Sequence, residues 1–181
     1  MIMADLSKNT ARNRILTTAA QLFYTRGINA TGIDLIIAEA GVAKASLYNN
    51  FDSKEALVAA YLEKLKCDFE ELLTSEVEAR GKLLDIPFDL LERSLIQGGF
   101  YGCPFTNALT ELPESSLVRE QVQAYRDVVS DYFLTITNGD ELVTDQLMLV
   151  YDGAFTSCKL DPNSKKVLGA RNLARKLANL S

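Results

Sequence analysis

The sequence predicts an all-α protein of about nine helices, with a short N-terminal domain followed by a larger helical body. Three observations lead to this prediction. Apolar residues recur at spacings of three and four along nearly the whole chain, which is the helical period. Glycine and proline stand between these segments, where they end or begin helices. No segment carries the strict apolar–polar alternation that is typical of a half-buried strand.

The first two predicted helices each end at a glycine. One spans Ala11–Arg26, because the apolar residues at 15, 19, 22 and 23 share a face, and Gly27 follows its last turn. The second follows Thr31, whose hydroxyl is placed to cap it, with Asp34 three residues later as in a capping box. Its apolar stripe lies at 33, 36, 37 and 40, and Gly41 ends it.

The next two predicted helices complete the N-terminal part. A short helix spans Lys44–Asn50, and a longer one begins after Asp52 and Ser53, which can cap it, and continues to 79. Residues 1–66 carry eight basic and six acidic side chains, a net charge of +2, whereas residues 67–181 carry 11 and 18, a net charge of −7. A mildly basic head on an acidic body is typical of a phosphate-contacting module with a separate body, and ordinary surface variation is the alternative, which a difference of this size does not exclude.

Five further helices make up the predicted body. They span 83–97, 105–112, 117–136, 141–157 and 164–180. The first starts near Ile86-Pro87, because proline suits a first helical turn, and glycines at 98 and 99 end it. Pro104 and Pro113 bracket the short second helix, and a turn at 138–139 separates the third from the fourth.

The composition argues against an enzyme. The 181 residues include no histidine, which removes histidine-based nucleophile pairs, histidine general bases and the common zinc sites. Cys67, Cys103 and Cys158 are odd in number and widely spaced, as reduced thiols are. No apolar run is long enough for a membrane span or a signal peptide, so we expect a cytoplasmic protein with no membrane partner, no cofactor and no metal.

The segment Thr31–Phe51 has the pattern of a helix-turn-helix. Two short helices are separated by Ala-Gly-Val at 40–42, where glycine permits the tight turn. In this motif the second helix enters the DNA major groove. Leu47 and Phe51, four residues apart, would anchor that helix to the core, while its small and polar side chains face base edges and phosphates.

These residues resemble the DNA-binding domain of the tetracycline-repressor (TetR) family. The matching elements are AAQLF, Gly27, Thr31, IAEAGVAKASLYNNF and SKEAL, which together span 19–57. A further segment, GCPFTNA at 102–108, is similar to one found in a branch of the family whose members also carry GIDxIIAEAGVAK. The chain length and the predicted helix count fit the family's plan of a DNA-binding domain, here 1–54, and a ligand-binding and dimerisation domain, here 55–181.

The resemblance implies which side chains meet DNA. The candidates are Thr31, Lys44, Ala45, Ser46, Tyr48, Asn49 and Lys54. Tyr48 has the alternative of a buried aromatic, and Lys54 that of a solvated surface charge. The chain departs from the family at Ala43, where most members have a serine that caps the recognition helix, at Ala45, where glycine is common, and at 49–50, where aromatic residues or histidine are usual.

The resemblance also implies a small-molecule effector bound in the body. The break at 98–113, between two longer helices, predicts imperfect packing and therefore a cavity for an apolar, aromatic ligand. The candidate lining residues are Cys103, Phe105, Asn107, Leu109, Glu111, Tyr125, Phe133 and Phe155. Asn107 and Glu111 either orient a ligand or lie in solvent, and Cys103 is either a small core residue or a redox switch.

The implied function is sequence-specific regulation of transcription by a homodimer on a pseudo-palindromic operator in double-stranded DNA, released by the effector. Both repressors and activators occur in the family, and repression is the expected mode. Dimerisation is expected through a four-helix bundle that uses the last two helices of each subunit. The expected contact residues are Leu142, Leu147, Val150, Ala154, Phe155, Val167, Ala170, Leu173, Ala174, Leu177 and Ala178. The alternative is a helical small-molecule carrier or enzyme that does not bind DNA and has no need of Lys44–Tyr48.

Overall fold

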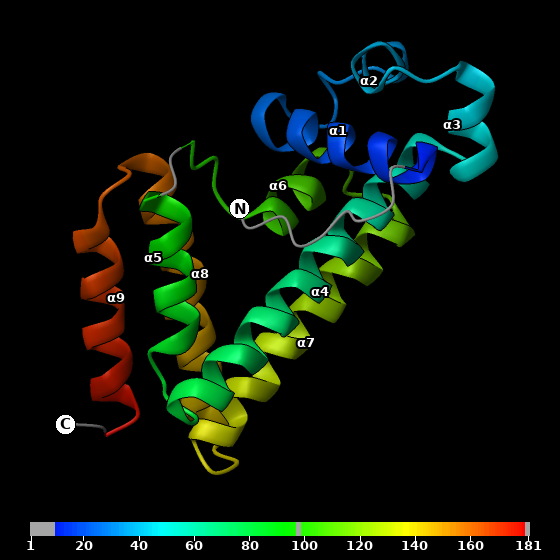
Figure 1. The fold of residues 1–181 in the computed structure, drawn as a ribbon. Coiled ribbons are helices and arrows are strands. Elements are labelled where there is room, and N and C mark those ends of the chain that lie inside the picture. The colour runs from blue at the N-terminus through cyan, green and yellow to red at the C-terminus, as the bar shows by residue number, and fades with distance from the viewer. Residues whose placement is uncertain (1–9, 97–98, 180–181) are drawn as a thin grey trace. The chain divides into compact units, whose positions relative to one another are not determined.

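The computed structural model describes residues 10–96 and 99–179 and is helical throughout (Figure 1). These residues form nine α-helices and no strand, which confirms the predicted fold class. The helices are α1 (Ala11–Arg26), α2 (Ile33–Ala40), α3 (Lys44–Asn50), α4 (Lys54–Arg80), α5 (Ile86–Ile96), α6 (Pro104–Glu111), α7 (Ser116–Ile136), α8 (Glu141–Leu160) and α9 (Ser164–Leu177). None of these helices combines the length and the apolar character that a bilayer span requires.

Local capping explains where several helices begin and end. The hydroxyl of Thr10 accepts the N–H of Asn13 and caps α1, whose last turn closes at Gly27 through a 3.0 Å bond to the carbonyl of Phe23. The predicted glycine cap is therefore confirmed. Helix α5 starts at Ile86, as the following proline indicates, and its predicted end at 97–98 lies outside the described residues. Helix α9 ends at Leu177, earlier than the predicted end at 180.

The chain divides into two compact units, which α4 and α7 both enter. The N-terminal unit comprises the described residues 10–68 and 104–123, so that α6 groups with α1–α3 and not with the remaining body helices. The core of the N-terminal unit includes the buried side chains of Ile15, Phe23, Ile36, Leu47, Leu57, Leu62 and Phe105.

The C-terminal unit comprises the described residues 69–96, 99–103 and 124–179. Its centre is aromatic: Phe88, Phe133 and Tyr151 are buried, and their ring centroids lie 5.5–6.2 Å apart. Two of the three pairs are edge-to-face, an arrangement that the ring quadrupoles favour. Helices α5, α8 and α9 pack together around this centre.

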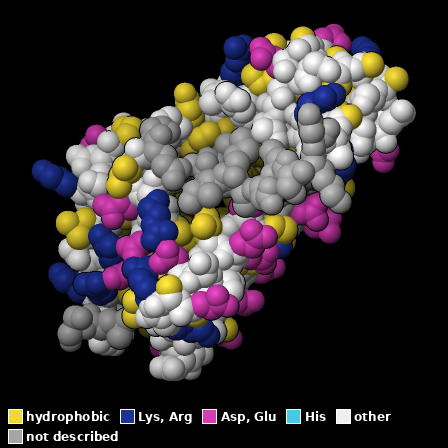
Figure 2. Space-filling view, in the orientation of Figure 1, with side chains coloured by type: hydrophobic (Ala, Val, Ile, Leu, Met, Phe, Trp, Pro, Cys, Tyr) yellow, Lys and Arg dark blue, Asp and Glu magenta, His cyan; other side chains and the backbone are white. Residues whose placement is uncertain are grey.

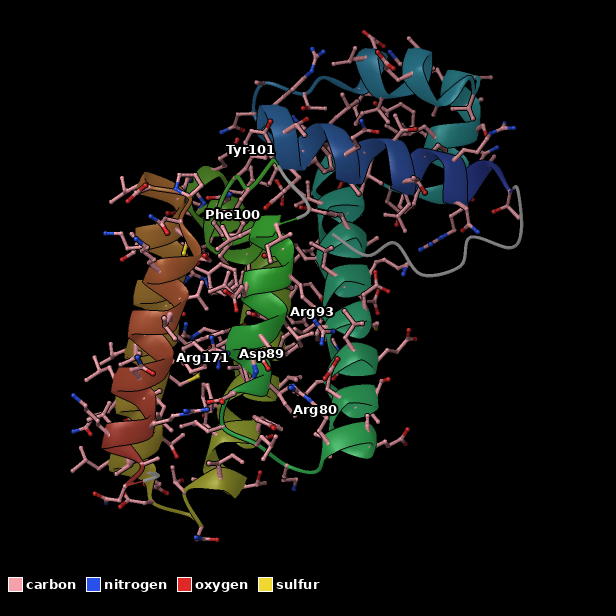
Figure 3. All side chains as sticks on the ribbon, turned by 60° about the vertical axis from the view of Figure 1, so that its left-hand side comes forward. Arg80, Asp89, Arg93, Phe100, Tyr101 and Arg171 are labelled. Atoms are coloured by element: carbon pink, nitrogen blue, oxygen red, sulfur yellow. The ribbon has the colours of Figure 1, made fainter. Side chains whose placement is uncertain are left out.

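Ion pairs join the end of α4 to α5 and α5 to α9. Figure 3 shows Arg80 and Arg171 approaching Asp89 from α4 and α9, at N–O distances of 3.0 and 2.6 Å. Glu76 links Arg80 to Arg93 at 2.9 and 2.6 Å. On the face drawn in Figure 2, basic and acidic side chains accordingly interleave over α5 and α9. Since every one of these charges has an opposite partner, we assign the network to stability and not to ligand binding.

Candidate nucleic-acid interface

A tight turn joins α2 to α3. Gly41 adopts the left-handed conformation (φ 61°, ψ 44°), its N–H bonds to the carbonyl of Ala38 at 3.3 Å, and the next N–H, of Val42, bonds to the carbonyl of Ile37 at 3.2 Å. These two bonds define a Schellman motif. A Cβ at position 41 would meet no atom within 4 Å, so glycine is favoured there by its backbone conformation and not by space.

Helix α3 begins at an unusual cap. Ala43 occupies the N-cap with an extended backbone (φ −74°, ψ 150°), and its side chain offers no oxygen to the first turn. The N–H groups of Ser46 and Leu47 both bond to the carbonyl of Ala43, at 2.9 and 3.3 Å. The helix therefore starts where the sequence predicts, without the side-chain bond that usually stabilises such a start.

The two faces of α3 differ sharply in exposure. Leu47 is fully buried and Phe51 nearly so, and the guanidinium of Arg12 lies 4.9 Å from the centre of the Phe51 ring. Both predicted anchors are confirmed. The opposite face exposes the side chains of Lys44, Ala45, Tyr48 and Asn49. Tyr48 is 47% exposed, so the alternative of a buried aromatic is wrong.

Polar contacts on this face leave its groups accessible. Lys44 lies 3.4 Å from Asp34, and both side chains are more than half exposed. An exposed pair of this kind contributes about 1 kcal/mol or less, so a phosphate can take the place of the carboxylate. Ser46 is half-buried, and its carbonyl accepts a 2.7 Å bond from the side chain of Asn50. That bond holds the last turn of α3.

Thr31 does not play its predicted role. Its side chain is fully buried, and its hydroxyl donates a 2.7 Å bond to the carbonyl of Gly27. Gly32, which has no side-chain oxygen, occupies the N-cap of α2. The predicted cap is therefore wrong, because the hydroxyl satisfies a carbonyl of the preceding turn instead. With its side chain fully buried, Thr31 exposes no group to solvent in this structure.

Lys54 is the first residue of α4 and lies in the same unit as α3. The hydroxyl of Ser53 accepts the N–H of Ala56 at 3.0 Å, which confirms that Ser53 caps this helix. Lys54 is half-buried, and burial lowers the pKa of its amine, while the nearby carboxylate of Glu111 opposes that shift. A phosphate oxygen would act in the same direction as Glu111 and favour the charged amine.

Four of the candidate effector-binding residues lie in the C-terminal unit. The hydroxyl of Tyr125 lies 3.4 Å from that of Tyr151, and burial raises the pKa of both phenols. Cys103 is close enough to raise both pKa values further. Phe155 packs against Tyr151 with a ring separation of 5.2 Å, and Phe133 is fully buried in the aromatic centre.

Tyr151 is a residue of this cluster that sequence reasoning missed. It stands four residues before Phe155, so the two side chains share a face of α8. The four-residue spacing from Phe155 could therefore have placed Tyr151 in the cluster from the sequence.

The other four candidates lie on α6, in the N-terminal unit. Phe105 is buried, and Asn107 and Leu109 are half-buried. Glu111 is directed elsewhere: its carboxylate accepts the backbone N–H groups of Ile28 and Asn29 at 3.0 and 2.7 Å. The sequence offers a ligand contact or solvent for this side chain, and in the structure its carboxylate binds the turn after α1.

Comparison with known proteins agrees with this geometry. Residues 15–61 match the family model described as bacterial regulatory proteins of the tetR family. The transcriptional repressor DhaR of Mycobacterium sp. (strain GP1) is 26% identical over 175 residues, which cover 87% of each protein. The transcriptional activator FasR of Mycolicibacterium smegmatis is 31% identical over 134 residues, covering 70% of this chain and 60% of FasR.

A solved structure extends the likeness to the whole fold. The crystal structure of a TetR-family transcriptional regulator from Streptomyces coelicolor superposes with a TM-score of 0.78 and 30% sequence identity. The match covers 93% of this chain and 94% of that one. It therefore includes the body helices as well as the helix-turn-helix.

Proposed function

This chain belongs to the tetracycline-repressor (TetR) family of bacterial transcriptional regulators, and we propose that it binds a pseudo-palindromic operator as a homodimer and represses transcription. Members of this family are DNA-binding regulators and not enzymes. The observation that carries the proposal is the exposed face of α3, held on the core by Leu47 and Phe51. A single helix of 7 residues offers too little contact for a strong site, which favours two copies on two half-sites.

The side chains around α3 divide by chemistry. Lys44, Tyr48 and Lys54 carry groups that suit phosphate oxygens, and phosphate contacts fix the register of a protein on DNA. Ala45 and Asn49 are exposed on the same helix and suit base edges, since a small side chain permits close approach and an amide pairs with adenine. We therefore assign affinity chiefly to the first group and sequence preference to the second.

Binding measured against salt concentration tests this function. The probe is duplex DNA from upstream of the chain's own gene, labelled for fluorescence anisotropy. Lys54→Ala should weaken binding to all sequences alike and reduce the slope of log affinity against log salt by about 0.9 for each phosphate that the variant no longer neutralises. Lys82→Ala, at an exposed position in the C-terminal unit, is the matched control. An unchanged slope in Lys54→Ala would remove Lys54 from the interface.

The proposal includes an effector that binds the body and releases the DNA. The aromatic cluster with two buried phenols supports a small apolar, aromatic ligand, uncharged because the body is net negative. Release follows if the ligand binds better to the conformation that fits DNA poorly. When an uncharged aromatic effector is added to the complex of protein and labelled DNA, the DNA should dissociate. The fluorescence anisotropy of the labelled DNA should then fall. In transcription reactions, the protein should reduce the transcript; an increase would make it an activator.

A further inference from the structure

The end of α6 is bonded to the turn between α1 and α2. The two oxygens of the Glu111 carboxylate accept separate backbone N–H groups, Oε1 that of Ile28 and Oε2 that of Asn29. In return, the side-chain amide of Asn29 donates to the main-chain carbonyl of Glu111 at 3.1 Å. The residues lie 82 and 83 positions apart in sequence but within one compact unit. Three hydrogen bonds therefore connect α6 to the N-terminal helices at one point.

The backbone of Gly27 is shaped for this contact. Its φ of +90° is a conformation that other residues rarely adopt, and a Cβ there would lie 3.2 Å from Oε1 of Glu111. The carboxylate thus rests directly on the C-cap of α1. Bonds from backbone N–H groups to an ionised acceptor are about twice as strong as bonds between neutral groups. The two bonds to the carboxylate are therefore stronger than bonds to a neutral acceptor in the same place would be.

A fourth hydrogen bond connects the same corner to the start of α4. Ser115, which directly precedes α7 and is buried, donates a 2.7 Å bond from its hydroxyl to the carboxylate of Glu55. Glu55 lies in the first turn of α4, next to Lys54. The segment 111–115 is therefore bonded on one side to the turn that precedes the helix-turn-helix and on the other to the helix that follows it.

We propose that Glu111 is a positioning residue for operator binding: its carboxylate holds α1–α3 at the orientation relative to α6 that presents α3 to DNA. This inference rests on the proposed function, because orientation matters only if α3 enters the groove. Glu111 itself contributes no phosphate or base contact. Without the bonds the N-terminal helices sample more orientations, and the apparent affinity falls by the fraction of molecules that remain competent.

The test is Glu111→Gln, which places an NH₂ donor against one of the two N–H groups and removes that bond. Glu114→Gln is the matched control, since it removes the same charge from an exposed position three residues away. In the DNA-free protein, amide hydrogen exchange should accelerate about tenfold or more at whichever of Ile28 and Asn29 loses its bond, as expected when a bond to a charged acceptor is removed. Operator affinity should fall by about three- to tenfold while its salt slope stays at the wild-type value.

Two further variants separate positioning from general damage. Glu111→Asp keeps the charge but shortens the side chain, and should behave like Glu111→Gln. Asn29→Ala removes only the returned bond at an exposed position and should give a smaller effect in the same direction, even if the Glu111 variants fold poorly. Unchanged exchange at both amides, or an operator affinity that is unchanged or higher, overturns the proposal. If wild-type protein binds no operator, the proposed function fails, whereas the exchange measurement still decides whether the Glu111 contact exists in solution.

Discussion

At the residue scale, Ala43 sits at a helix start that lacks a side-chain acceptor. The first N–H groups of any helix have no partner within the helix, and an N-cap oxygen normally accepts one of them. Here the backbone is already in the extended conformation that a capping residue needs, and the side chain is exposed. The position can therefore accept a serine without a clash or a change in backbone.

Ala43→Ser should stabilise the protein against unfolding by about 0.5–2 kcal/mol, the usual gain from a restored N-cap. Chemical denaturation of both proteins at the same pH measures the difference. Ala45→Ser is the control, because serine inside a helix is slightly unfavourable and offers no cap. Equal denaturation midpoints for Ala43→Ser and wild type would show that water already bonds to the free N–H groups in the first turn of α3.

Other residues show why side-chain roles are harder to predict than helix positions. Thr31 stands at a capping spacing, yet its hydroxyl donates to the carbonyl of Gly27. Accepting an N–H of α2 and donating to that carbonyl would each satisfy one backbone polar group. The sequence does not rank them. The partners of Glu111 lie more than 80 residues away, so no local pattern could connect them. By contrast, the roles of Leu47 and Phe51 follow from spacing alone and were predicted correctly.

At the scale of helices, several boundaries coincide with glycine or proline, although Gly153 and Gly169 lie inside α8 and α9. Gly27 and Gly41 end α1 and α2 as predicted. Helix α8 is longer than predicted and ends at Leu160 instead of Ser157. Nothing at 158–160 breaks a helix, and the effective signal is Pro162, which disfavours helical backbone at the residue before it. Breaking residues thus fixed the helix end more reliably than the apolar pattern did.

The aromatic cluster of the C-terminal unit gives a pH prediction. Burial raises the pKa of Tyr125 and Tyr151 in the folded protein above the unfolded value of about 10. Below pH 10 both the folded and the unfolded state keep these protons, so the contribution of the two phenols to the free energy of unfolding is fully present. Above it the unfolded chain ionises while the folded protein does not, and stability should fall by up to about 1.4 kcal/mol per pH unit for each phenol.

Urea unfolding between pH 9 and 11.5, roughly one unit either side of an ordinary tyrosine pKa, measures this slope. The double variant Tyr125→Phe/Tyr151→Phe should reduce the loss of stability at high pH. Tyr48→Phe, which removes an exposed hydroxyl, serves as the comparison. Equal slopes in the double variant and wild type would mean that other groups cause the alkaline unfolding.

At the scale of the whole molecule, the faces of α8 and α9 differ from those predicted for the dimer. Leu147, Ala154, Val167 and Ala174 were expected at the subunit interface, yet all four are buried within the chain's own core. The apolar stripe of each helix is wide enough to face either the chain's own core or a partner subunit. The helical period of the sequence therefore could not distinguish core residues from interface residues. The burial pattern assigns these residues to the fold and leaves a different set for a partner.

Three leucines of α8 form an exposed stripe. Leu142, Leu149 and Leu160 are 69%, 72% and 83% exposed, and their spacings of seven and eleven place them on one face of the helix. Leu173 on the adjacent α9 is also exposed. Three leucines this exposed on one face are unfavourable in water and mark a contact surface. A second copy of the chain is the occupant that fits the proposed operator symmetry, since a two-fold interface pairs each patch with itself.

Leu149→Glu should therefore give monomers and weaken operator binding strongly, because a charge at the centre of the stripe would be buried without a partner in the dimer. Light scattering measures the mass, and the anisotropy assay measures the affinity. Leu117→Glu makes the same change at an exposed leucine of α7 and should remain dimeric. The folded monomer should keep its helical circular dichroism, since Leu149 contributes little to its own core. A Leu149→Glu protein that is still dimeric would place the interface elsewhere, and the operator would then have to be read by subunits joined through another face.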